Sequence, residues 1–279
     1  MRCNYHTHCN YCDGKEEMVR FVDKAAELHF DHLGFSSHAP IGFRNKFSIQ
    51  EEQIPQYLAE IEMYKPKYQN LTLYSALECD FVPGLSIDFE KFTDKYDFDY
   101  LIGGVHLVGD SSMPELWFID GGDPKVYDYG LMNYFGGNVH KAVTTFWEQT
   151  FEMIETQKFE IIAHFDKIKM HNHDRYFRED EKWYRDLAVH AVDLIKEKNL
   201  IVEINSRGLY RGRCDSFYPA DFLLREVAKR DIPCIISSDA HKSEELPLFY
   251  DEARQHLKDA GVRALVALVN GKWIEDELL

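Results

Sequence analysis

The sequence lacks any long hydrophobic run. No stretch of its 279 residues approaches the roughly 20 consecutive apolar residues that a membrane-spanning helix needs. The first residues also lack the basic segment and the apolar core of a secretory signal. We therefore expect a soluble, cytoplasmic protein with no membrane partner.

Cysteine and positive charge are also scarce. Six cysteines are too few for a disulfide framework in a chain of 279 residues, and they fit a reducing compartment. Asp and Glu total 48 against 32 Lys and Arg, so the formal charge of −16 disfavours nucleic acid as the main partner. Bound divalent cations would offset part of this negative charge.

Internal repeats and low-complexity tracts are absent, and 45% of the residues are hydrophobic, as in an ordinary globular domain. Short apolar runs alternate with segments of helical period. This alternation predicts a parallel sheet with right-handed crossovers, and about seven such units favour an α/β barrel in a single domain over residues 1–279. The predicted strands are 33–37, 73–79, 101–107, 160–165, 200–205 and 234–238, and the predicted helices are 18–28, 51–64, 139–155, 181–198, 219–229 and 244–260.

One segment interrupts the alternation. Residues 109–138 are rich in glycine, aspartate and aromatic residues, and they are too long for a simple connection. We expect them to form a lid-like insertion over the mouth of the barrel. Their aromatic side chains either line the organic part of a substrate or pack within the insertion itself. These residues are Trp117, Phe118, Tyr127, Tyr129, Tyr134 and Phe135.

Histidines and acidic residues recur where the predicted strands end. His6 and His8 alternate near the start of the chain and share one face of an extended strand, as do Asp239 and His241 after the last strand. Barrel enzymes place their chemistry at this end of the strands. Burying so many imidazoles and carboxylates at one rim would cost free energy unless cations paired with them. Mixed histidine and carboxylate ligands suit Zn²⁺, Fe²⁺ or Mn²⁺, and more than four such ligands predict more than one ion. Other residues in such positions are His38, Glu78, His106 and His164.

Motifs that contain these residues follow one another between residue 5 and about residue 245. They are His6-x-His8, Cys12-Asp13-Gly14, Ser37-His38, Glu78, Gly104-Val105-His106, His164-Phe165-Asp166, Glu203-Ile204-Asn205 and Ser238-Asp239-Ala240-His241. In content and order they resemble the PHP (polymerase and histidinol phosphatase) superfamily. Within it, the sequence is most similar to the monofunctional histidinol-phosphate phosphatases.

The resemblance implies a distorted (β/α)7 barrel that holds three divalent metal ions, Zn²⁺, Mn²⁺ or Fe²⁺, at the C-terminal rim of the strands. Asp13-Gly14 is also a common turn sequence, and the resemblance favours Asp13 as a ligand. The implied ligand sets are His6, His8, Glu78 and Asp239 for one ion; Glu78, His106 and His164 for the second; and Asp13, His38 and His241 for the third.

Clustered divalent ions lower the pKa of bound water, orient a phosphoryl oxygen and neutralise developing charge, as hydrolysis of a phosphomonoester requires. Asp239 and His241 are candidate catalytic proton donors, a role that the sequence does not separate from metal ligation. Phosphate also needs fixed hydrogen-bond donors, and arginine suits it well. Candidate substrate contacts are Asn205, Arg207, Arg211 and Lys169.

The resemblance implies hydrolysis of L-histidinol phosphate to L-histidinol and phosphate, in histidine biosynthesis. The alternative is another small phosphate ester, such as a nucleotide or a sugar phosphate, because the metal ligands specify the bond cleaved and not the group attached. Arg207 stands where small residues are usual in the family, so it is either a distinct substrate contact or a surface replacement. We expect Cys9 and Cys12 to serve in packing.

Nucleic-acid processing, as in the PHP exonuclease domains of DNA polymerases, is a less favoured function because of the negative charge. A non-catalytic binding module is also less favoured. Such a module would be expected to have lost some ligands, whereas all nine positions hold residues that can bind metal.

Overall fold

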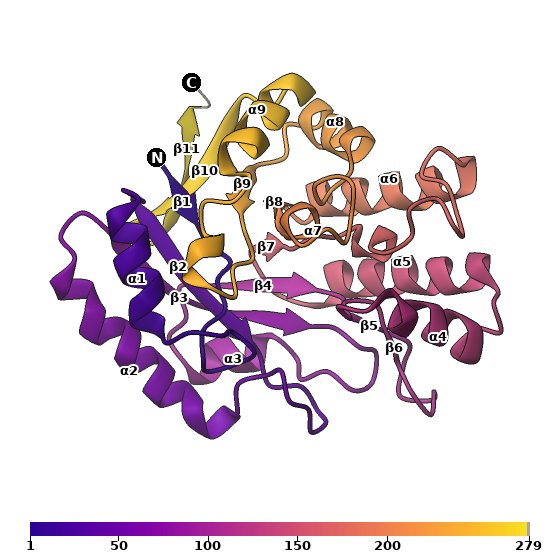
Figure 1. Ribbon diagram of the computed structural model, residues 1–279, viewed down its shortest axis with the longest axis horizontal. Coiled ribbons are helices and arrows are strands. Elements are labelled where there is room, and N and C mark those ends of the chain that lie inside the picture. The colour runs from indigo at the N-terminus through magenta and orange to yellow at the C-terminus, as the bar shows by residue number, and fades with distance from the viewer. Residues whose placement is uncertain (278–279) are drawn as a thin grey trace.

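The computed structural model of the protein describes residues 1–277, in which helices surround a central sheet (Figure 1). The sheet is parallel except for the antiparallel pairing of its last two strands. In spatial order its strands are β1 (Cys3–Asn4), β2 (His32–His38), β3 (Thr72–Asp80), β4 (Tyr100–Gly104), β7 (Ile161–Ile162), β8 (Ile201–Asn205), β9 (Cys234–Ser237), β10 (Ala264–Val269) and β11 (Lys272–Glu277).

The strands β1 to β9 of this sheet approach a closed barrel. Just beyond β1, Thr7 forms a parallel bridge with Ala240, which follows β9. The His8 N–H donates to the Ala240 carbonyl at 2.8 Å. Earlier along β9, Cys234 pairs with Leu265 of β10 instead. The predicted α/β fold is confirmed, but the barrel is not fully closed, because its first and last parallel strands meet only at the C-terminal rim.

Helices lie close to the predicted positions and cover the outside of the sheet (Figure 1). One prediction was too long: residues 244–249 are outside the last helix. Pro247 lacks an N–H group, and Phe249 has a left-handed backbone with φ of 59°, so the helix begins only at Tyr250. The helices that correspond to the predicted ones are α1 (Met18–Glu27), α2 (Ile54–Tyr64), α5 (Val139–Thr156), α6 (Lys182–Glu197), α8 (Asp221–Lys229) and α9 (Tyr250–Ala260).

Helix α5 shows how the apolar stripe predicted from sequence becomes core. The Asn138 side chain accepts a hydrogen bond from the Lys141 backbone at 3.0 Å and caps the helix start. Trp147 on the buried face is fully enclosed and packs edge-on against Phe165 and Tyr184. These contacts fix α5 beside helix α6 and the loop after β7 that leads to the candidate site.

Residues 109–138, the predicted insertion, are partly packed into the core. They contain β6 (Trp117–Phe118), which pairs with β5 (Leu107–Val108), and helix α4 (Pro124–Tyr134). Trp117 is buried and donates to the Tyr127 carbonyl, while the Tyr127 hydroxyl donates to the Ile168 carbonyl. For these two aromatic residues the packing interpretation holds, whereas Phe118 and Tyr129 are exposed.

The sequence prediction missed the β10–β11 hairpin and the short helix α3 (Glu90–Lys95). Asn270 and Gly271 join the two strands of the hairpin with φ of 50° and 73°. Asn-Gly is the preferred sequence of such a two-residue turn, so a signal for this hairpin was present. Within residues 1–277, no helix has the length and apolar character needed to cross a membrane.

Candidate metal centre

The nine predicted ligands lie together at the C-terminal rim of the strands. Parallel strands end at the same edge of a sheet, so residues distant in sequence meet there. Eight of the nine are buried, and the side chain of Asp13 is 33% exposed. They are His6 and His8 after β1, Asp13 before α1, His38 in β2, Glu78 in β3, His106 after β4, His164 after β7, and Asp239 and His241 after β9.

Glu78 lies at the centre of this cluster. Its Oε2 atom is within 3.3 Å of three imidazole nitrogens, and its Oε1 atom is within 3.4 Å of two more. Such a carboxylate can be shared between neighbouring ions. The five nitrogens are Nε2 of His6, Nε2 of His8, Nδ1 of His38, Nε2 of His106 and Nε2 of His164.

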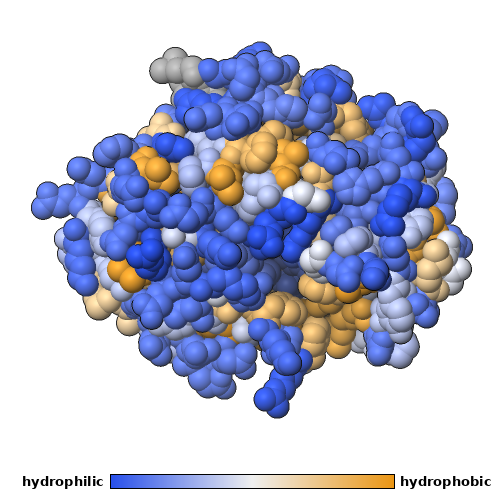
Figure 2. All heavy atoms as spheres, in the orientation of Figure 1, coloured by the Kyte–Doolittle hydropathy of each residue, from blue (hydrophilic) through white to orange (hydrophobic). Residues whose placement is uncertain are grey.

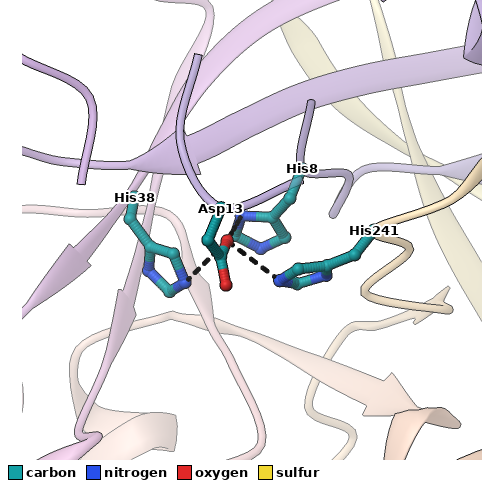
Figure 3. Close-up of side chains that lie close together, drawn as sticks. All are labelled: His8, Asp13, His38 and His241. Atoms are coloured by element: carbon teal, nitrogen blue, oxygen red, sulfur yellow. Dashed lines mark ion pairs between the residues drawn. The ribbon is translucent and has the colours of Figure 1, made fainter. Parts of the chain in front are cut away.

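A second group surrounds Asp13 (Figure 3). The Asp13 Oδ1 atom lies 3.1 Å from Nε2 of His241, 3.9 Å from Nε2 of His38 and 4.0 Å from Nδ1 of His8. Figure 3 shows these side chains converging although they come from three distant parts of the chain. His8 and His38 also contact Glu78, so this group is continuous with the first one.

The donor set fits divalent metal ions. Nε2 of His6 is 3.0 Å from Nε2 of His8, and Nε2 of His106 is 3.2 Å from Nε2 of His164. Asp13 Oδ1 and His164 Nδ1 are buried without a hydrogen-bond partner, which is unfavourable unless another group satisfies them. Facing imidazoles around shared carboxylates provide mixed nitrogen and oxygen ligation of the kind that zinc, iron and manganese accept.

The electrostatics of the cluster keep its carboxylates ionised but divide its histidines. Against the effect of burial, Glu203 and Glu78 raise the pKa of His6 well above its usual value, and Asp80 raises the pKa of His106 to about 9, so metal binding at these two imidazoles would displace a proton. Burial alone would raise the pKa of Glu78, but His6, His106 and His38 hold it well below its usual value. The pKa of Asp239 is likewise depressed despite burial. Burial lowers the pKa of His8, and its histidine neighbours lower it further. Ionised carboxylates and a neutral imidazole are the states that coordinate a cation.

Three side chains hold the outer ring nitrogens of the histidines. Nδ1 of His6 is 2.6 Å from Glu203 Oε1, and Nδ1 of His106 is 2.7 Å from Asp80 Oδ1. Nδ1 of His8 is 3.5 Å from Cys12 Sγ. The sequence prediction had no role for Asp80, although it lies two residues after Glu78 in β3 and so shares its face. All six cysteines are free thiols, and Cys9 is buried, in agreement with packing.

Two predicted substrate contacts are occupied by other interactions. The Lys169 ammonium contacts Asp166 at 3.0 Å, the Ser216 hydroxyl at 2.9 Å and the Phe217 carbonyl at 2.8 Å. An ammonium has three donors, and these contacts use all of them, so the structure does not favour Lys169 as a phosphate contact. The Asn205 amide donates to Glu203 at 3.0 Å and to Asp239 at 3.3 Å, which leaves it no free N–H for a substrate.

The two predicted arginines differ in position. Arg207 begins the short helix α7 (Arg207–Tyr210), and its Nη1 atom donates to the Asp239 carbonyl at 2.7 Å. Its side chain is 12% exposed and therefore lies against the cluster, not at the surface. The Arg211 side chain is 41% exposed and lies 3.6 Å from Glu245 Oε1. The surface interpretation of Arg207 is therefore wrong.

Sequence reasoning missed Lys167 and Asp120. The Lys167 ammonium is buried and lies 3.1 Å from Asp120 Oδ1, which belongs to the insertion, and Arg213 Nη1 is 3.8 Å from the same oxygen. Burial and the charge of Lys167 both lower the pKa of His164, which places Lys167 beside the cluster. Burial opposes ionisation of Asp120, but Lys167 keeps its pKa at about 2. Figure 2 shows a central hollow on this face, with hydrophilic residues along much of its border.

Comparison with known proteins identifies the family. The PHP domain family matches residues 4–207, which is more than half of the chain. The chain therefore belongs to the PHP domain family, as its motifs indicated.

The chain is similar over most of its length to proteins named as histidinol phosphatases. A protein of Deinococcus radiodurans named "Probable histidinol-phosphatase" is 27% identical, with 94% of this chain and 95% of that relative covered. The histidinol-phosphatase of Bacillus subtilis is 23% identical, with 88% of this chain and 96% of that relative covered. A crystal structure of histidinol phosphate phosphatase from Lactococcus lactis, complexed with Zn, L-histidinol and phosphate, matches with a TM-score of 0.74 at 20% identity, covering 98% of each chain. This likeness confirms the PHP-type fold.

Proposed function

We propose that the protein hydrolyses L-histidinol phosphate to L-histidinol and phosphate, using three divalent ions, Zn²⁺, Mn²⁺ or Fe²⁺. The protein is an enzyme of the histidinol-phosphatase type, a hydrolase. The observation that carries the proposal is the convergence of five imidazoles on the Glu78 carboxylate, with buried cationic side chains next to them. The names of the relatives support the choice of substrate.

The nine side chains would hold the ions in the sets that the family resemblance implies. Bound divalent ions supply water of lowered pKa and neutralise the charge that develops on the phosphoryl oxygens. Arg207 and Lys167 border the cluster and would orient the phosphoryl group by charge-assisted hydrogen bonds. Nδ1 of His241 lies 3.5 Å from Oδ1 of Asp239. Because the depressed pKa of Asp239 leaves its carboxylate ionised, His241 rather than Asp239 would give a proton to the leaving oxygen of histidinol.

A panel of phosphate esters tests this function. Metal-free protein is reloaded separately with Zn²⁺, Mn²⁺ or Fe²⁺ and assayed on L-histidinol phosphate, nucleoside monophosphates and sugar phosphates. We expect kcat/KM for L-histidinol phosphate to exceed that for each other ester with at least one metal. Turnover of a nucleotide or a sugar phosphate without turnover of L-histidinol phosphate would contradict the proposed substrate and favour the alternative.

The two neighbouring lysines provide a matched pair of variants. In Lys167→Met we expect kcat/KM to fall by about 10- to 100-fold, because a charge-assisted hydrogen bond contributes about 1.5–3 kcal/mol. In Lys169→Met we expect the free energy of unfolding to fall by about 3–5 kcal/mol, because Asp166 would stay buried without its counter-ion. Steady-state kinetics and denaturant unfolding measure both effects. Unchanged kinetics in Lys167→Met would remove this residue from the substrate site.

A further inference from the structure

Glu203 is a fully buried carboxylate to which the reaction above gives no role. It lies in β8, and both of its oxygens are engaged. Oε1 is 2.6 Å from Nδ1 of His6, and Oε2 accepts the backbone N–H of His164 at 3.1 Å. Oε2 also accepts the amide of Asn205 at 3.0 Å. One side chain therefore links the segments that follow β1 and β7 to the end of its own strand, β8.

Each of these contacts leads to a different predicted metal ligand. His6 and His164 are ligands themselves, and the Asn205 amide also donates to Asp239 Oδ2 at 3.3 Å. His164 and Asp239 both have left-handed backbones, with φ of 28° and 51°. This conformation costs a non-glycine residue about 1–3 kcal/mol and needs support from its surroundings. The contacts of Glu203 provide that support from β8, the strand between the two ligand segments.

The contact with His6 also determines which ring nitrogen is available. A carboxylate at Nδ1 favours the tautomer with its proton on that atom. Nε2 then carries the lone pair, and this atom lies 3.2 Å from Glu78 Oε2 and 3.9 Å from Asp239 Oδ1. Hydrogen bonds of this kind orient metal-binding histidines and raise their basicity.

We propose that Glu203 is a positioning residue for the metal centre. It holds His6 with Nε2 directed into the cluster, fixes the backbone of His164, and orients the carboxylate of Asp239 through Asn205. This role rests on the metal-binding part of the proposed function and does not depend on the ester that is hydrolysed. A test that measures metal binding directly therefore separates it from the choice of substrate.

The test compares Glu203→Gln with Glu160→Gln. Glutamine preserves the size of the side chain but removes its charge and half of its acceptor capacity. Glu160 is a suitable control because it directly precedes β7, whereas His164 follows this strand, so Glu160 lies at the end away from the cluster. Its Oε2 atom accepts the Leu101 N–H at 2.8 Å. Zn²⁺ affinity is measured by competition with a chromophoric chelator, and the visible spectrum of the Co²⁺-loaded protein reports ligand geometry.

We expect the Kd for Zn²⁺ to rise by about 10- to 100-fold in Glu203→Gln, with an altered Co²⁺ spectrum, and to stay within about twofold in Glu160→Gln. An unchanged Kd and spectrum in Glu203→Gln would overturn the proposal.

Histidine ¹⁵N NMR of the Zn²⁺-loaded wild type gives a second test that needs no variant to fold. A proton on Nδ1 of His6 is expected, and a proton on Nε2 would overturn the proposal. If Glu203→Gln weakens Zn²⁺ binding but the wild type does not hydrolyse L-histidinol phosphate, the role of Glu203 is upheld and only the proposed substrate is refuted.

Discussion

Replacement of Glu78 by glutamine is expected to abolish phosphatase activity and to lower the metal content together. The carboxylate contacts five imidazoles, so its loss affects more than one ion. Metal ions contribute several kcal/mol of transition-state stabilisation, and each 1.36 kcal/mol changes the rate tenfold. We therefore expect kcat to fall by about 10³-fold or more. The measurement is steady-state kinetics with elemental analysis of the same sample.

The control for this variant is Glu62→Gln. The Glu62 side chain is 64% exposed in α2 and pairs only with the nearby Lys65 in the described part of the chain. We expect wild-type kinetics and metal content there, because an exposed ion pair contributes little. Retention of most of the activity and zinc in Glu78→Gln would mean that Glu78 does not bridge the ions.

Removal of the metal should lower thermal stability. The cluster gathers buried carboxylates and imidazoles that lack full hydrogen bonding, and ions that bind only the folded state stabilise it by mass action. At a free-ion concentration 1,000 times Kd, this linkage provides about 4 kcal/mol for each ion. For a chain of this size, each kcal/mol corresponds to a change in Tm of roughly 2–4 °C. We expect a chelator to lower Tm by at least about 8 °C.

Differential scanning calorimetry with and without chelator measures this shift, and added Zn²⁺ should restore the original Tm. Mg²⁺ is the control, because it prefers oxygen ligands and is poorly suited to a cluster rich in imidazole. An identical Tm for the metal-loaded and chelated proteins would show that the cluster does not couple metal binding to folding.

A simple rule was sufficient to place eight of the nine candidate ligands at one rim, whereas Asp13, in a common turn sequence, was included only through the family resemblance. Parallel strands end at one edge, so His38 and Glu78 could be placed together without knowing any packing. The structure brings all nine residues together there. The incomplete closure of the barrel could not be predicted from the sequence, because it depends on one bridge between two residues distant in the chain, Thr7 and Ala240.

The candidate substrate contacts were harder to predict because they lie in loops without periodicity. Lys167 and Lys169 occupy one short 3₁₀ turn, and nothing in the sequence shows that the first approaches the cluster while the second pairs with Asp166. Asp120 reaches the same region from an insertion whose path depends on the burial of Trp117. In each case, tertiary packing determines which side chain faces the site.

The most direct test of the account is the metal content of the purified wild-type protein. After metal-free preparation, reloading with Zn²⁺ and extensive dialysis, elemental analysis should find close to three zinc ions per chain. Less than one ion per chain in folded protein would contradict the claim that these nine side chains form a metal centre.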